Sequence, residues 1–322
     1  MSTSTLPGTP LRSIGLLLPL ILALPGTVLA QELPRTALAE EETGDTWSPS
    51  ERYFARPLAS NREPVFALRL LGSTVFRGRS APSERSPFDF PGQDGLDVDV
   101  QGEAALGGAF RIWQPIQWNG GGLILGLQAG VFGRFRLEVS SSDLVASDWI
   151  VSLPAEVAWG SWSARLKITH WSAHIGDEMI EGAGAERVDF TSETLDALAA
   201  YQYGWLRVYG GGGVVFRSSL ENEIQLGPGF SDDYQLRGGT DARWRPWARD
   251  DVTLNAGIDW QVSDRAAWGS QISARLGLTM HDDEGSRRAR FLLLYFDGPS
   301  PMGQFFLTNE RYWGFEVSLE GC

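Results

Sequence analysis

The chain has 322 residues, and its 27 Lys and Arg against 40 Asp and Glu give a formal net charge of −13. This acidic balance argues against nucleic acid as a partner, because binding to phosphate groups requires clustered positive charge. The one cysteine, Cys322, excludes a disulfide framework within the chain and a metal site built from cysteines. The surplus of 38 Gly and 13 Trp is the first sign that this is not an ordinary soluble domain.

The N-terminus has the pattern of a signal peptide. The apolar stretch Ile14–Leu24 follows a single basic residue, Arg12, and Val28 and Ala30 place small residues just before polar Gln31. We therefore expect residues 1–30 to be removed on export. No apolar run of 18 residues follows, so the sequence predicts no membrane-spanning helix in the mature chain.

Residues 31–63 are polar and acidic and contain proline, and we expect them to form an exposed periplasmic leader. From residue 64 onward, apolar and polar residues alternate almost to the end of the chain. Residues 252–262 give the clearest example, because Val252, Leu254 and Ala256 alternate with Thr253 and Asn255. Strict alternation is typical of a β-strand with one apolar and one polar face.

The alternation predicts twelve strands, at approximately 64–78, 98–113, 121–139, 145–159, 162–175, 186–203, 205–218, 233–246, 251–264, 266–280, 287–297 and 311–319. Short turns mostly alternate with longer connections along the chain. An even number of strands joined in this way is typical of bacterial outer-membrane barrels. The sequence therefore predicts an all-β fold, a transmembrane up-and-down antiparallel β-barrel of about 12 strands over residues 64–322. Both termini would lie on the periplasmic side.

Aromatic residues flank four of the five short turns. Rings gathered at one level of a barrel form an interfacial girdle between lipid tails and water. The alternative is that tryptophan caps the strands of a soluble barrel or sandwich. The pairs are Trp113 with Trp118, Trp159 with Trp162, Tyr203 with Trp205, and Trp244 with Trp247.

The alternation also predicts which way charged residues point. Arg237, Asp241, Arg243 and Arg245 alternate with apolar residues such as Leu236, so we expect these four charges to face the lumen, the interior of the barrel. A charge facing lipid would be costly, whereas Arg and Asp on one interior wall neutralise each other. The apolar set must then form the outer face.

Two of the three histidines lie in one stretch, and this is the strongest candidate for chemistry. His170, Ser172 and His174 continue the outward parity of Leu166 and Ile168 towards the predicted extracellular end of the strand. A polar trio on a lipid-facing parity is unexpected from patterning alone. The alternative is that the trio ends a strand at the membrane interface, before a solvated loop that begins with Asp177 and Glu178.

Strand geometry limits what the trio can do. Residues two apart are separated by about 6.6 Å, so a serine and a histidine that lean together could hydrogen-bond. His170 and His174 would lie about 13 Å apart, too far to share one metal ion. We therefore predict no metal site, and the sharper chemical hypothesis is a Ser172 nucleophile with His170 as its base. Asp189 or Glu193 on the following strand would orient the imidazole.

The sequence resembles a family of Gram-negative outer-membrane proteins, the domain of unknown function 1207. The resemblance rests on stretches from both ends of the mature chain: Phe54–Ala59, Arg62–Pro64, His170–Glu178 (which includes Gly176), Tyr295–Pro301 and Gly303–Phe306. It implies a surface barrel and assigns no activity.

A second, local resemblance is to outer-membrane phospholipase A and the lipid A deacylases, which are barrels with an outward-facing His-x-Ser motif near the outer leaflet. Thr169, His170 and Ser172 match that motif, whereas Ala173 and His174 stand where these enzymes usually have Asn and Gly. The resemblance implies ester hydrolysis at Ser172.

Two functional hypotheses follow. The first is an integral outer-membrane barrel with a structural, binding or transport role and no cofactor, and the second is a lipid acyl hydrolase, for which Ca²⁺ would be the candidate cofactor. Both predict location in the bacterial outer membrane, with outer-membrane lipids and the barrel-assembly machinery as partners. The sequence predicts neither the ligand nor the oligomeric state.

Overall fold

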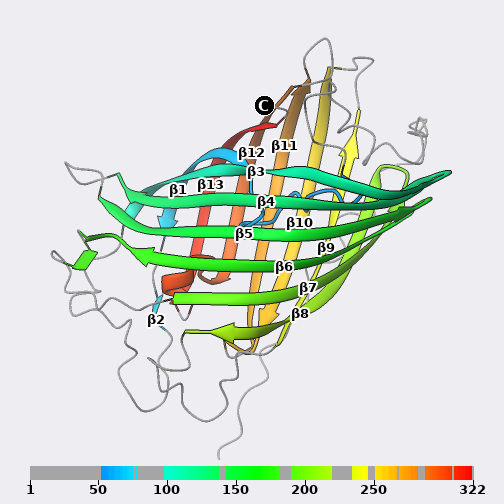
Figure 1. Ribbon diagram of the computed structural model, residues 1–322. Coiled ribbons are helices and arrows are strands. Elements are labelled where there is room, and N and C mark those ends of the chain that lie inside the picture. Colours follow the sequence, from blue (N-terminus) through cyan, green and yellow to red (C-terminus); the bar gives the residue numbers. More distant parts are fainter. Residues whose placement is uncertain are drawn as a thin grey trace, which may run out of the picture. The chain divides into compact units, whose positions relative to one another are not determined.

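The computed structural model describes residues 52–74, 77–78, 98–137, 143–177, 179–180, 190–219, 234–245, 251–266, 268–281, 287–306 and 308–320. The predicted signal peptide and the first part of the predicted leader lie outside these residues. Within the described part of the chain, twelve long antiparallel strands form one closed barrel, together with a two-residue strand, β2. Figure 1 shows the strands following one another in chain order. The barrel closes where β1 pairs with both β3 and β13.

The strands are β1 (Phe66–Thr74), β2 (Arg77–Gly78), β3 (Val98–Trp118), β4 (Gly121–Arg136), β5 (Leu144–Trp159), β6 (Trp162–Ile175), β7 (Phe190–Tyr203), β8 (Leu206–Ser218), β9 (Tyr234–Trp244), β10 (Val252–Ser263), β11 (Gly269–His281), β12 (Arg288–Pro299) and β13 (Thr308–Glu320). This confirms the predicted all-β barrel and its strand count. One 3₁₀ turn, η2 (Gly303–Phe305), precedes β13. No helix among the described residues is long and apolar enough to cross a membrane.

The barrel is polar inside and apolar outside. On β6, Leu166 and Ile168 are 50% and 49% exposed, whereas the alternate residues Arg165, Lys167 and Thr169 are buried. The same alternation recurs around the barrel, so apolar side chains cover its outer surface. A strand satisfies this pattern without strain, because successive side chains point to opposite faces of the sheet.

Most predicted strand bounds lie within four residues of the observed ones, but two strands differ in a way that has a structural reason. The strand predicted over 98–113 continues to Trp118, with register shifts against β4 near Trp113, so only a tight turn at 119–120 remains. Bulges of this kind insert an extra residue, and they interrupt the strict alternation from which the boundary was predicted. The strand predicted over 64–78 divides into β1 and β2, and β2 pairs with β13.

The described aromatic residues beside the short turns are exposed. The connectivity puts the β3–β4, β5–β6, β7–β8 and β9–β10 turns at one end of the barrel. Trp247 lies outside the described residues, and the exposed residues are Trp113, Trp118, Trp159, Trp162, Tyr203, Trp205 and Trp244.

The expectation of an exposed leader up to residue 63 is wrong for its described part. Residues Arg52–Val65, which we call the lumenal segment, are mostly buried, and Phe54 and Ala59 are fully inaccessible. The polar composition that suggested exposure instead matches the charged interior of the barrel. The segment is held there by hydrogen bonds and ion pairs to inward-facing residues of several strands.

The connection between β12 and β13 also enters the barrel. The sequence predicted a long loop over 298–310, but β13 already begins at Thr308 and the residues around η2 are buried. Gly303 has to be glycine here, because a Cβ atom at this position would lie 2.6 Å from Cβ of Ala173. The lumen is therefore filled from two sides, by the lumenal segment and by residues 300–306.

Candidate functional site

The His170–His174 stretch lies on the outer face of β6, as parity predicts. His170 and His174 are exposed and Ser172 is half-buried. His170 Nδ1 lies 3.1 Å from Oε1 of Glu193, which is the cross-strand partner of His170 on β7. Ser172 Oγ lies 3.1 Å from Nε2 of His174.

These contacts form two separate pairs instead of the predicted chain. The sequence hypothesis assigned His170 as the base for Ser172, but the hydrogen bond of Ser172 runs to His174. The predicted contact between His170 and a carboxylate on the next strand is present at Glu193, which also lies 4.0 Å from Nε of Arg217. The structure thus keeps the predicted His170–carboxylate contact, but His174 takes the place of His170 as the partner of Ser172.

The remaining described residues of the His170–Glu178 stretch take no part in these two polar pairs. Gly176 is buried and its backbone N–H donates to the carbonyl of Val145, and Asp177 is exposed. The alternative orienting residue, Asp189, and the predicted loop residue Glu178 lie outside the described residues. No group of three or more His, Cys, Asp or Glu side chains is arranged to hold a metal ion in the part of the chain that the structure describes.

The lumen contains clusters of buried ion pairs, one of them centred on Glu63. Glu63, in the lumenal segment, accepts hydrogen bonds from Nη2 of Arg165 at 2.6 Å and from Nζ of Lys167 at 3.3 Å. Nη1 of Arg237 lies 3.5 Å from the same carboxylate. Burial by itself would raise the pKa of Glu63, but the attraction of the three cations outweighs burial and holds this pKa well below its usual value.

Of the four charged residues predicted to face the lumen, Arg237 and Asp241 form ion pairs or hydrogen bonds with other lumenal residues. Arg237 also pairs with Asp259 at 2.8 Å. Asp241 is buried, accepts a hydrogen bond from the backbone N–H of Leu58 at 3.0 Å, and lies 3.4 Å from Nη1 of Arg207. The other two, Arg243 and Arg245, are half-buried near the end of β9.

A second cluster lies around Arg62. Its Nε donates to Asp148 at 3.0 Å and to the carbonyl of Pro301 at 2.8 Å, and its guanidinium also contacts Glu103. Asp148 in turn accepts a hydrogen bond from the backbone N–H of Gly303. Arg62 therefore joins the lumenal segment, the barrel wall and the 300–306 connection.

The stretches that carry the family resemblance meet at this point. Arg62, Pro301 and Gln304 belong to three of these stretches, and the side chain of Arg62 donates to the carbonyl of Pro301. Nε2 of Gln304 donates to the carbonyl of Ala173, in a fourth stretch, at 2.7 Å. Residues far apart in the sequence are thus brought together inside the barrel, although the His170–Glu178 stretch places its histidines on the outside.

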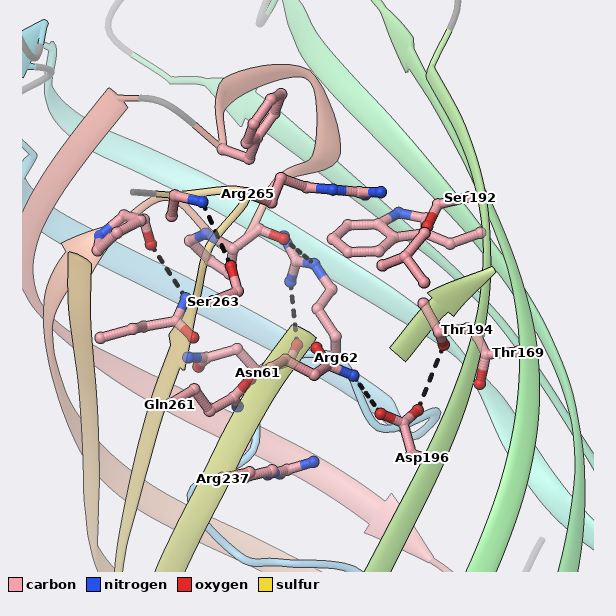
Figure 2. A pocket seen from close by; sticks show the side chains of 18 of the residues that line it. Asn61, Arg62, Thr169, Ser192, Thr194, Asp196, Arg237, Gln261, Ser263 and Arg265 are labelled. Atoms are coloured by element: carbon pink, nitrogen blue, oxygen red, sulfur yellow. Dashed lines mark hydrogen bonds between the residues drawn. The ribbon is translucent and has the colours of Figure 1, made fainter. Parts of the chain in front are cut away.

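A cavity of about 200 Å³ remains beside these groups. We call it the lumenal cavity. It lies between the lumenal segment, the inner wall from β5 to β11, and the β12–β13 connection. In Figure 2, Ser192, Thr194 and Asp196 lie on one side, Gln261 and Ser263 lie opposite, and Asn61 and Arg62 reach in from the lumenal segment.

Sequence reasoning missed most of the lumenal residues. The sequence does indicate that Arg165 and Lys167 face the lumen, because they alternate with outward-facing Leu166 and Ile168. The sequence gives no such indication for Glu63, since it lies in a stretch without periodicity. Its position depends on contacts with distant strands.

Among solved structures, the barrel is similar to the outer membrane phospholipase of Salmonella typhi, solved as a dimer with bound calcium. The TM-score is 0.54 at 14% identity, covering 89% of this chain and 98% of that one. The outer membrane phospholipase A of Escherichia coli, solved as an active-site mutant, is similar with a TM-score of 0.53 at 14% identity, covering 89% and 98% of the two chains. At this low identity the likeness shows a shared outer-membrane barrel fold alone.

The search of functionally curated proteins gives no match. Residues 92–320, well over half of the chain, match the family described as "Protein of unknown function (DUF1207)", and the protein therefore belongs to this family.

Proposed function

We propose that the protein is an integral barrel of the bacterial outer membrane whose lumen is closed by its own N-terminal segment. Its role on this proposal is structural or binding, and it is not a permanently open pore. Lipids of the outer membrane surround it, and the barrel-assembly machinery inserts it. The signal peptide predicted over residues 1–30 is consistent with this route.

The outer surface supports the membrane location. Large apolar side chains are exposed on strands all around the barrel, including Leu70, Leu153, Leu276 and Leu293. A soluble protein rarely exposes so continuous an apolar surface, whereas a membrane barrel requires one. The fold shared with outer-membrane phospholipase A agrees with this interpretation.

The contacts of the lumenal segment are the observation that carries the proposal of a closed lumen. Glu156 accepts hydrogen bonds from Arg52 at 2.6 Å and from the backbone of Tyr53 and Phe54 at 3.0 Å each. Nη1 of Arg275 donates to the carbonyls of Leu58 and Ser60, both at 2.6 Å. Together with the contacts of Arg62 and Glu63, these bonds hold the segment along much of the lumen.

Conductance in a planar bilayer tests the closed lumen. The wild-type protein should insert without producing stable current steps. The double variant Arg62→Ala/Glu63→Ala removes two anchors of the lumenal segment and should produce channel openings, whereas Arg311→Ala, in an exposed pair with Asp297, should stay silent. Stable open steps from the wild type would contradict the proposal.

The outward polar pairs favour a second candidate function, hydrolysis of lipid esters. Ser172 Oγ would attack the ester carbonyl and pass its proton to histidine, which returns it to the leaving alcohol, and water would then release the acid. The Ser172–His174 hydrogen bond supplies a nucleophile and a base, and the His170–Glu193 pair on the same face supplies a second imidazole in contact with a carboxylate. Ca²⁺ would be the candidate cofactor of this reaction.

A mixed-micelle assay with and without Ca²⁺ tests this candidate. If it is correct, Ser172→Ala abolishes hydrolysis while the heat-modifiable gel mobility of the folded barrel is retained. Comparison of His174→Asn with His170→Asn identifies the base, since the structure favours His174 and the sequence motif favours His170. Wild-type protein without activity in either condition removes the hydrolase candidate.

A further inference from the structure

The lumenal cavity contains polar groups that no described residue of the protein satisfies. Ser192 is completely buried, and none of the described residues bonds its Oγ. Nε1 of Trp171 is likewise buried without a partner among the described residues. Both residues line the cavity. A buried donor without an acceptor is costly, so native proteins rarely keep one without a water molecule or a ligand.

The two groups lie side by side. Trp171 on β6 and Ser192 on β7 are direct cross-strand partners, and both face the inside of the barrel. The Cβ atoms of such a pair are about 4.5–5.5 Å apart, so an indole N–H and a hydroxyl can both reach one small group. A carboxylate has two oxygen atoms that accept two such hydrogen bonds.

The surrounding charge favours an anion. The cavity wall carries five basic side chains, Arg62, Arg165, Lys167, Arg237 and Arg265, against two acidic ones, Glu63 and Asp196. Much of the basic charge is already paired, since Arg237 binds Asp259 and Arg62 binds Asp148, both from outside the lining. A lining with more basic than acidic side chains favours an anion over a cation, and these existing ion pairs favour a single negative charge over several.

The part of the cavity wall beside these two donors is apolar and aromatic. The rings of Trp171 and Phe190 meet edge to face at 5.1 Å between centroids, and Phe306 follows at 6.0 Å from Phe190. The guanidinium of Arg265 lies over Phe190 at 5.5 Å and over Phe306 at 6.0 Å. Such a wall receives a flat or aliphatic body better than a hydrated inorganic ion.

The volume is consistent with an organic molecule. One water needs roughly 10–15 Å³ of such space, and the cavity offers about 200 Å³. We propose that the lumenal cavity binds a small organic anion with a single negative charge and an apolar body, such as an aromatic carboxylate, through hydrogen bonds from Ser192 and Trp171. This goes beyond closure of the lumen, because binding does not depend on whether the barrel conducts.

Calorimetric titration of the full-length protein in detergent micelles tests the proposal, with benzoate as the probe. Benzoate should bind saturably, and the neutral analogue benzyl alcohol should bind roughly tenfold more weakly, because hydrogen bonds to a charged group are stronger. Inorganic phosphate, which lacks an apolar body, should not bind. Phosphate binding as tight as that of benzoate would overturn the requirement for an apolar body.

Two conservative variants locate the site. Ser192→Ala and Trp171→Phe each remove one donor and keep the shape, so each should weaken benzoate binding roughly twofold to tenfold. Ser318→Ala is the matched control, because Ser318 is also fully buried and its Oγ has no hydrogen-bond partner among the described residues, but it does not line the cavity. Absence of benzoate binding, equal binding of the two analogues, or equal binding by all three variants would each overturn the proposal.

Discussion

A single carboxylate, Glu63, holds together three basic side chains that face the lumen. Arg165, Lys167 and Arg237 come from β6 and β9, and all lie within 3.5 Å of the Glu63 carboxylate oxygens. Removing one charged partner from such a cluster strongly lowers the free energy of unfolding. The reason is that the remaining buried charges then lack both an opposite charge and full solvation by water.

Glu63→Gln should therefore be strongly destabilising. The substitution keeps the shape of the side chain but removes its charge, and we expect a loss of about 3–5 kcal/mol in the free energy of unfolding. Urea titration of the barrel refolded into lipid vesicles measures this quantity. The control Arg311→Gln disrupts a pair with side chains 67% and 34% exposed, and it should cost at most about 1 kcal/mol. Equal losses for the two variants would show that Glu63 does not have this role.

At the residue scale, the sequence predicts the direction of a side chain better than its partner. Parity places His170, Ser172 and His174 on the outer face, and the structure agrees. The hydrogen-bond partner of Ser172 depends on side-chain torsion angles, which alternation does not encode. Both histidines are two residues from Ser172, so spacing alone could not choose between them.

At the scale of elements, the strands were predictable because a strand with one apolar and one polar face shows apolar residues at every second position of the sequence. The predicted bounds of β6, 162–175, match the structure. The lumenal segment was not predictable, because it has no regular period and its polarity resembles that of an exposed leader. In a barrel with a charged interior, polar composition no longer distinguishes buried from exposed segments.

Contacts between the lumenal segment and the wall depend on glycine at several positions. A Cβ atom at Gly257 would lie 3.0 Å from Cβ of Leu58, and one at Gly130 would lie 3.2 Å from Cβ of Pro64. Any larger side chain there would push the segment away from the wall. Part of the glycine surplus of the sequence thus follows from the filled lumen.

This close approach allows a disulfide to test where the lumenal segment lies. In a Cys322→Ser background, Leu58→Cys with Gly257→Cys should oxidise spontaneously, since the two Cβ positions need to move apart by only about 0.5 Å to reach disulfide geometry. Faster migration of the denatured, unreduced protein on a gel reports the closed loop. Leu58→Cys with Leu276→Cys is the control, because Leu276 faces outward, and it should give no shift. A missing shift in the first variant would contradict the buried position of the segment.

At the scale of the whole barrel, the distribution of polarity is the reverse of that in a soluble protein. The acidic, arginine-rich composition becomes a set of ion pairs in the lumen, exemplified by Arg69 with Glu316 and by Arg134 with Glu310. Arginine suits this interior because its planar guanidinium can bind two carboxylates at once. The apolar residues displaced from the interior form the outer surface, which only a lipid environment would stabilise.

A charge on the outer surface should therefore have an effect that depends on its depth in the bilayer. Leu293 lies in the middle of β12 and is 61% exposed, so Leu293→Arg should destabilise the barrel in lipid vesicles by about 2–4 kcal/mol. Tyr203 is 74% exposed but ends β7 beside a short turn, where the predicted interface lies. Tyr203→Arg should therefore cost at most about 1 kcal/mol. Unfolding titrations in the same vesicles compare the two variants. Similar losses would mean that the apolar surface does not face a bilayer core, since only a hydrocarbon layer makes the cost of an arginine depend on its position along the strand.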